Sequence, residues 1–206
     1  ADTSRWACRR CEFDSAARTE IQGRVLSIDA TSPRFGRDNG LDTEDETADL
    51  DVAFSDTDDE GRRIELAGMR LGLESRRVDA SVSTPRLEVT GAWKETPRKN
   101  TAGGLTPYSG AASLVLPEGW LRSDTTDGMT FLESSSRRFE DSTRRKTGAI
   151  DATFDVTSEL RLGARYRREA KTGRIETAAD MFYRAVALPK PIDYETNTFE
   201  GRVTYR

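Results

Sequence analysis

The residues best suited to chemistry in this chain are its two cysteines, Cys8 and Cys11, in the stretch WACRRCEF. A C-x-x-C spacing can attach haem, hold zinc or support thiol–disulfide exchange. The 206 residues include no histidine, and Glu12 follows Cys11 where haem attachment requires a histidine. Zinc needs about four thiolate or imidazole ligands, so two thiolates fill half a site. The alternatives left are a disulfide or idle thiols in a tether, and a redox pair.

Other catalytic or metal-binding arrangements find no support in the sequence. Without histidine, a Ser-His-Asp or Cys-His pair is impossible. The acidic runs DTEDETADLD and SDTDDE lack the ligand spacing of a calcium-binding loop, which needs Gly at its sixth position and Glu at its twelfth. We therefore expect no enzyme activity, no catalytic residue, and no metal or cofactor bound by this chain.

The composition is polar but balanced in charge. Hydrophobic residues make up 35% and charged residues 33%, with 32 basic and 36 acidic side chains and a net charge of -4. The basic residues form no continuous stripe, so we expect no nucleic-acid partner. No run of about 18 apolar residues is present, so no transmembrane helix is expected. A chain as polar as this one forms an ordered structure only if its apolar residues are regularly spaced.

Apolar residues recur with a period of two, which is typical of strands. In SELRLGARYRR, for example, Leu160 and Leu162 alternate with Arg161. The predicted strands lie near 19–30, 48–57, 61–71, 76–83, 86–95, 147–156, 159–168 and 199–206, with bulges in the first and third, where the alternation changes phase. The predicted apolar set is Leu87, Val89, Trp93, Ile150, Phe154, Leu160, Leu162, Tyr166, Phe199, Val203 and Tyr205. The predicted charged set is Glu88, Lys94, Asp151, Asp155, Arg161, Arg165, Arg167, Glu200 and Arg202.

The connections between these strands differ in length. Long connections are predicted near 31–47, 96–146 and 169–193, and all three fall at one end of the sheet if the strands are antiparallel. Bacterial outer-membrane barrels have this asymmetry, with short periplasmic turns, long extracellular loops and apolar residues facing lipid. A soluble β-sandwich also has alternating strands, and its apolar faces fill one shared core. The opposite face predicted here is dense in Arg, Asp and Glu, which suits a wet lumen better. We predict an all-β, antiparallel transmembrane barrel segment of about eight strands.

Five stretches in order resemble one known family. They are RFGRDNGL at 34–41, LDVAFSDTDDEGRRIELAGMRLGLESR, TPYSG, LVLPEGW and ALPKPIDYET. Together they resemble the MtrB/PioB family of outer-membrane β-barrels associated with decahaem cytochromes, and the C-x-x-C also fits that family. The resemblance implies a barrel that encloses and positions a multihaem c-type cytochrome for electron transfer across the outer membrane. The haem c belongs to the partner, and a second, surface-exposed cytochrome is a further expected partner.

The resemblance and the alternation together define the expected organisation. Residues 1–18 form a periplasmic tether with the C-x-x-C, and 19–206 form the barrel segment in the lipid of the bacterial outer membrane. The charged set faces the lumen and contacts the cytochrome, and the apolar set faces lipid. Eight strands close a barrel that side chains just fill, so we expect the N-terminal part of a longer barrel. A porin-like passive channel and a soluble β-rich binding module are the alternatives.

Overall fold

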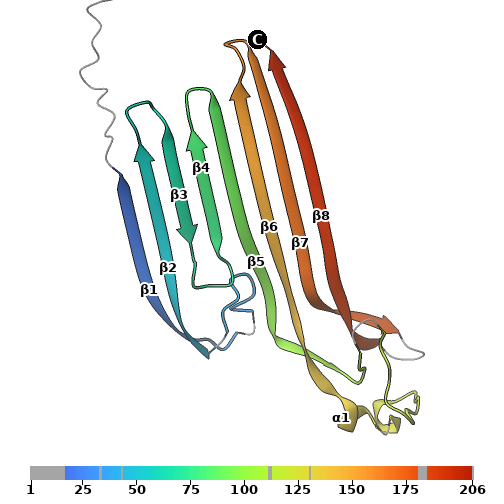
Figure 1. Cartoon of the computed structure of the whole chain (residues 1–206). Coiled ribbons are helices and arrows are strands. Elements are labelled where there is room, and N and C mark those ends of the chain that lie inside the picture. The colour runs from blue at the N-terminus through green and yellow to red at the C-terminus, as the bar shows by residue number, and fades with distance from the viewer. Residues whose placement is uncertain are drawn as a thin grey trace, which may run out of the picture.

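The computed structural model describes residues 17–32, 34–42, 44–110, 113–129, 131–180 and 185–205. The strands in these residues are β1 (Arg18–Asp29), β2 (Glu44–Thr57), β3 (Arg63–Met69), β4 (Arg77–Ser83), β5 (Leu87–Thr106), β6 (Arg137–Asp155), β7 (Leu160–Asp180) and β8 (Ala185–Tyr205). They form one eight-stranded sheet in the order β1-β2-β3-β4-β5-β6-β7-β8, and every neighbouring pair is antiparallel (Figure 1). The all-β, antiparallel prediction is confirmed. Cys8 and Cys11 lie outside the described residues.

Within the described residues, helix is confined to two short pieces between β5 and β6, η1 (Thr126–Gly128) and α1 (Leu132–Ser135). In the part of the chain that the structure describes, no helix has the length and hydrophobicity needed to cross a membrane.

The strands β5 to β8 extend well beyond β3 and β4 at the end that carries the longer connections, which we call the loop end (Figure 1). The predicted connection at 169–193 is therefore wrong, because β7 continues to Asp180 and β8 begins at Ala185. Likewise the predicted connection at 96–146 narrows to 107–136. Apolar residues such as Phe139, Leu188 and Ile192 are mixed with charged residues in these extensions, so they show no regular alternation. Backbone hydrogen bonds pair them nonetheless, since ladder bonds do not depend on side-chain type.

The predicted bulges near 19–30 and 61–71 are also wrong. β1 pairs with β2 in unbroken register from Arg18 to Asp29, and β3 pairs in unbroken register with both of its neighbours. The change of phase arises because Leu26 and Ile28 lie half-buried on the otherwise polar side of β1. A shift of register occurs instead in β5, between Asn100 and Gly104.

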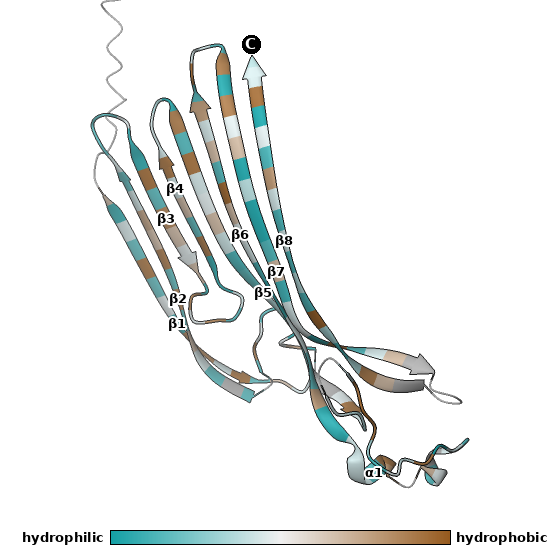
Figure 2. Cartoon of the chain, turned by 45° about the vertical axis from the view of Figure 1, so that its right-hand side comes forward, coloured by the Kyte–Doolittle hydropathy of each residue, from teal (hydrophilic) through white to brown (hydrophobic). Residues whose placement is uncertain are grey.

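Buried apolar side chains are few in the described residues, and they lie towards the loop end. They are Leu41, Leu73, Tyr108 and Phe139. None of the described residues forms a layer over the regular part of the sheet, and its hydrophobic side chains are exposed, with Val25 at 87% and Phe199 at 78%. Figure 2 shows hydrophobic and hydrophilic residues alternating along the strands. β1 and β8 each pair with one strand, so the sheet is open and its apolar side requires lipid or further protein to cover it.

Candidate functional site

The register of the strands divides the sheet into two chemically different faces. Residues paired directly across antiparallel strands point to the same side. One such row runs Leu87–Phe154–Leu162–Val203, and a row on the opposite side runs Thr90–Asp151–Arg165–Glu200. All residues of the predicted apolar set share the side of Leu162, which we call the apolar face, and all of the predicted charged set share the side of Arg165, the charged face.

The apolar face carries a continuous band that crosses the strands obliquely. Between β1 and β8 the centre of the band moves by about seven residues, or about 23 Å, along strands whose total spacing is about 34 Å. A horizontal band therefore requires strands tilted by about 35°, which lies within the range of outer-membrane barrels. The band comprises 21–25 in β1, 48–54 in β2, 64–68 in β3, 78–82 in β4, 87–93 in β5, 148–154 in β6, 160–166 in β7 and 199–205 in β8.

Aromatic residues mark both edges of the band. At the loop end, the rings of Tyr166 and Phe199 lie 4.7 Å apart, and the Tyr166 hydroxyl donates to Asn197 Oδ1 over 2.8 Å. At the turn end, the Tyr205 hydroxyl donates to Glu159 Oε2 over 2.9 Å. Rings with a polar tip turned to the edge are typical of the membrane–water interface.

Ion pairs, both between neighbouring strands and within single strands, cover the charged face. Between β6 and β7, Arg165 Nε lies 3.2 Å from Asp151 Oδ1, and the Arg161 guanidinium binds both Asp155 oxygens at 2.5 and 2.7 Å. Arg167 reaches Glu169 at 3.2 Å. The arginine side chains in these pairs are about half exposed, at 50–53%. Each cation is thus held by one carboxylate and still presents donors to whatever covers this face.

The same pattern continues on the N-terminal half of the charged face. Arg24 of β1 pairs with Asp49 and Asp51 of β2. On β4, Arg77 binds Asp79 through two nitrogens at 2.6 and 2.8 Å. The charged face is therefore a lattice of both signs across the whole sheet, which the sequence prediction covered only for β5 to β8.

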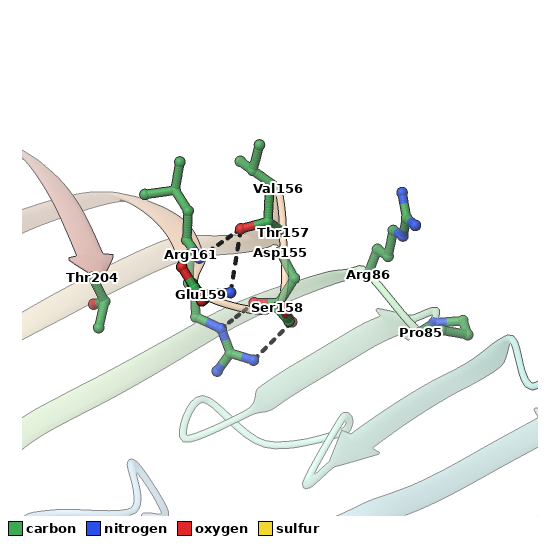
Figure 3. Close-up of a pocket in the computed structure, with 10 residues that line it drawn as sticks. Pro85, Arg86, Asp155, Val156, Thr157, Ser158, Glu159, Arg161 and Thr204 are labelled. Atoms are coloured by element: carbon green, nitrogen blue, oxygen red, sulfur yellow. Dashed lines mark hydrogen bonds and ion pairs between the residues drawn. The ribbon is translucent and has the colours of Figure 1, made fainter. Parts of the chain in front are cut away.

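Two hollows are lined in part by residues of the predicted charged set. One lies beside the β6–β7 turn, where Figure 3 shows Arg161 directed at Asp155 with Arg86 on the neighbouring turn. The other is lined by Asp151, Arg165, Glu200 and Arg202 together with small residues of β6 to β8. Glu88 and Lys94 share this face on β5. Their contact with a cytochrome stays a prediction.

Sequence reasoning missed a charged group on the apolar face. Glu95 is 2% exposed, and Arg76 and Lys146 lie 3.3 and 3.6 Å from its carboxylate oxygens. The guanidinium of Arg76 also lies 5.7 Å from the centre of the Trp93 ring. The alternation that ends at Trp93 continues with Glu95 on the same face, and that continuation was the available signal.

Comparison with known proteins decides the family. Residues 27–206 match the family model described as "Putative outer membrane beta-barrel porin, MtrB/PioB". This chain belongs to the MtrB/PioB family. The predicted resemblance is confirmed, and the MtrB/PioB chain is an outer-membrane β-barrel protein with a porin-like architecture.

A curated member of the MtrB/PioB family is similar over nearly all of the chain. It is "Outer membrane protein MtrB" of Shewanella baltica (strain OS185), which is 26% identical over 208 residues. The match covers 97% of this chain and 29% of that protein, in its N-terminal part. The chain thus spans less than a third of the length of this relative, in agreement with the open sheet.

Proposed function

We propose that this chain is part of an outer-membrane barrel that encloses and positions a multihaem c-type cytochrome, so that electrons cross the membrane through the haems of the partner. The observation that carries the proposal is the division of one sheet into an oblique apolar band and an opposite face of half-exposed ion pairs. A barrel with lipid outside and a hydrated protein inside needs this division. The resemblance to the MtrB/PioB barrels supplies the nature of the partner.

The charged face suits a protein partner because it offers both signs of charge at short intervals. Arg165 and Glu200 are direct cross-strand neighbours, as are Arg161 and Asp155. Such pairs can bind a hydrophilic surface through charge-assisted hydrogen bonds and bridging waters. The partner carries the haem c, and this chain contributes no cofactor. Charges fixed close to a haem also shift its reduction potential, so this face would tune the haems it encloses.

The orientation follows from the connections. In outer-membrane barrels the short turns are periplasmic and the long connections are extracellular. We therefore place the turns at 58–62, 84–86 and 156–159 in the periplasm, together with the N-terminus, and residues 107–136 outside the cell. The extended ends of β5 to β8 would then stand above the membrane, where a second, surface-exposed cytochrome could contact them.

A porin-like passive channel is the second candidate, because the description of the matching family contains the word porin. The same charged face would then line a water-filled pore. The two functions differ in whether a haem protein fills the lumen.

The test is to purify the native protein from outer membranes and measure haem absorbance per barrel. Arg165→Glu places a third carboxylate beside Asp151 and Glu200. We expect the haem retained to fall about tenfold, because reversing one paired charge at an interface costs well over 1 kcal/mol. Arg165→Lys keeps the charge and is the control, with near-normal retention expected.

Insertion must be measured in the same preparations. Haem retention that falls in Arg165→Glu while insertion is normal supports the proposal. Wild-type protein that purifies without any haem-containing partner would overturn it in favour of the passive channel.

A further inference from the structure

A layer of basic side chains lies on the apolar face just beyond the loop-end edge of the band. Arg76, Lys146 and Arg168 occupy the next positions of this face after Val78, Gly148 and Tyr166, where the band ends in three of the strands. Arg144 is one step further along β6. We call Arg76, Arg144, Lys146 and Arg168 the cationic layer. At the turn end, by contrast, the band in β4 to β7 reaches directly to the turns, where its last residues are Val82, Leu87, Phe154 and Leu160.

The centre of the cationic layer carries an excess of positive charge. Arg76 and Lys146 share the single carboxylate of Glu95, which is almost fully buried. Their own side chains remain 43% and 53% exposed. Within the described residues, Arg76 Nε has no hydrogen-bond partner. Two half-exposed cations on one buried carboxylate leave a net positive charge at the surface of the sheet.

The flanking cations are paired but accessible. Arg144 lies 2.6 Å from Glu74, and Arg168 lies 2.7 Å from Glu195. Both arginine side chains are exposed by 40% or more. A guanidinium has five N–H donors and one carboxylate engages at most two of them, so donors remain for a further anion.

The layer continues an ordered sequence of side chains on this face. Aliphatic residues form the middle of the band, and the aromatic residues Trp93, Tyr166 and Phe199 form its edge. Beyond that edge Arg168 follows Tyr166, and Arg76 and Lys146 lie on either side of Glu95, which follows Trp93. A membrane leaflet has the same order of hydrocarbon, interface and phosphate groups. Charge complementarity and position both therefore indicate a lipid phosphate as the ligand.

We propose that the cationic layer binds the phosphate groups of the glycolipid, of the lipid A type, that forms the outer leaflet of the outer membrane. The proposal rests on the orientation given under the proposed function, with the loop end outside the cell. The phosphate would bridge the exposed donors of Lys146 and Arg168, and the acyl chains would lie along the apolar band below them. This barrel would thereby be anchored at a defined height in the outer leaflet.

The experiment uses the native protein extracted from outer membranes, with bound lipid A measured by native mass spectrometry. The test variant is Lys146→Gln with Arg168→Gln. The control is Arg145→Gln with Lys171→Gln, which removes two cations at a similar height from the charged face. The purified proteins are then titrated with diphosphorylated lipid A, dephosphorylated lipid A and inorganic phosphate.

We expect the test variant to bind diphosphorylated lipid A about tenfold more weakly and the control to bind it as the wild type does. Equal binding of dephosphorylated lipid A would overturn the proposal. So would competition by inorganic phosphate at the same concentration, which would show an ordinary anion site. Wild-type protein that binds lipid A but purifies without a haem-containing partner would refute the proposed function alone, because the two are measured on opposite faces.

Discussion

The strongest test of the two faces is a charge placed in the middle of the apolar band. Leu162 is 41% exposed, lies between Phe154 and Val203 in its cross-strand row, and is close to the centre of the band in β7. An arginine near the bilayer midplane of an outer-membrane barrel costs about 2–4 kcal/mol. We therefore expect Leu162→Arg to lower the free energy of unfolding from lipid by that amount.

The control is Thr153→Arg, on the charged face at nearly the same depth. There the new guanidinium enters the ion-pair lattice and remains hydrated, so we expect a change of about 0.5 kcal/mol or less. Leu160→Arg should cost only about 0–1 kcal/mol, because Leu160 begins β7 at the edge of the band and an arginine there can reach the interface.

The assay is equilibrium unfolding by urea of the full-length protein reconstituted in lipid vesicles. The folded fraction is measured on gels from the difference in mobility between heated and unheated samples. Leu162→Arg must cost more than both Leu160→Arg and Thr153→Arg. If Thr153→Arg costs as much as Leu162→Arg, the charged face does not line a hydrated interior. A larger cost for Thr153→Arg would mean that the two faces are exchanged.

Two further predictions concern the loop end. Glu95→Gln leaves Arg76 and Lys146 without their shared carboxylate, and we expect it to destabilise the protein by about 1–3 kcal/mol in the same urea assay. The control is Glu65→Gln, which changes a half-exposed carboxylate and should alter stability by about 1 kcal/mol at most. Equal effects of the two substitutions would contradict a structural role for Glu95. Gly173 has φ of 134°, and a Cβ there would lie 2.2 Å from the Ser142 carbonyl oxygen, so Gly173→Ala should cost about 1–3 kcal/mol locally and speed proteolysis of the β7–β8 extension. Gly201→Ala, which meets no atom within 4 Å, is its control, and unchanged proteolysis in Gly173→Ala would show that the backbone there adapts without strain.

The assignment of residues to faces was largely available from the sequence. Successive Cβ atoms of a strand alternate between its two sides, which is a local property of the chain. Leu162 and Arg165 therefore belong to opposite faces whatever strand lies beside them, and the structure places both as expected. The family could also be recognised from the order of short motifs such as RFGRDNGL.

The extent of the strands could not be predicted in the same way. Arg174 and Ile175 of β7 pair with Pro191 and Lys190 of β8 although apolar and charged residues are mixed irregularly in this region. Backbone ladders form there without any alternating pattern, because the hydrogen bonds come from the main chain. The Thr106 hydroxyl donates to the Ala187 carbonyl oxygen over 2.9 Å and so joins β5 to β8, although the two residues are 81 positions apart in the sequence.

What the sequence determined by itself is thus the all-β class, the two faces and the absence of histidine chemistry, since each depends on residue type and on the period of a single strand. The tertiary structure alone decided the register between strands. The register aligns the apolar stretches of the separate strands into one oblique band. The slope of that band sets the strand tilt of about 35°. The register also brings Arg76, Glu95 and Lys146 from three segments to one point, a meeting that depends on how strands stagger and that no local pattern encodes.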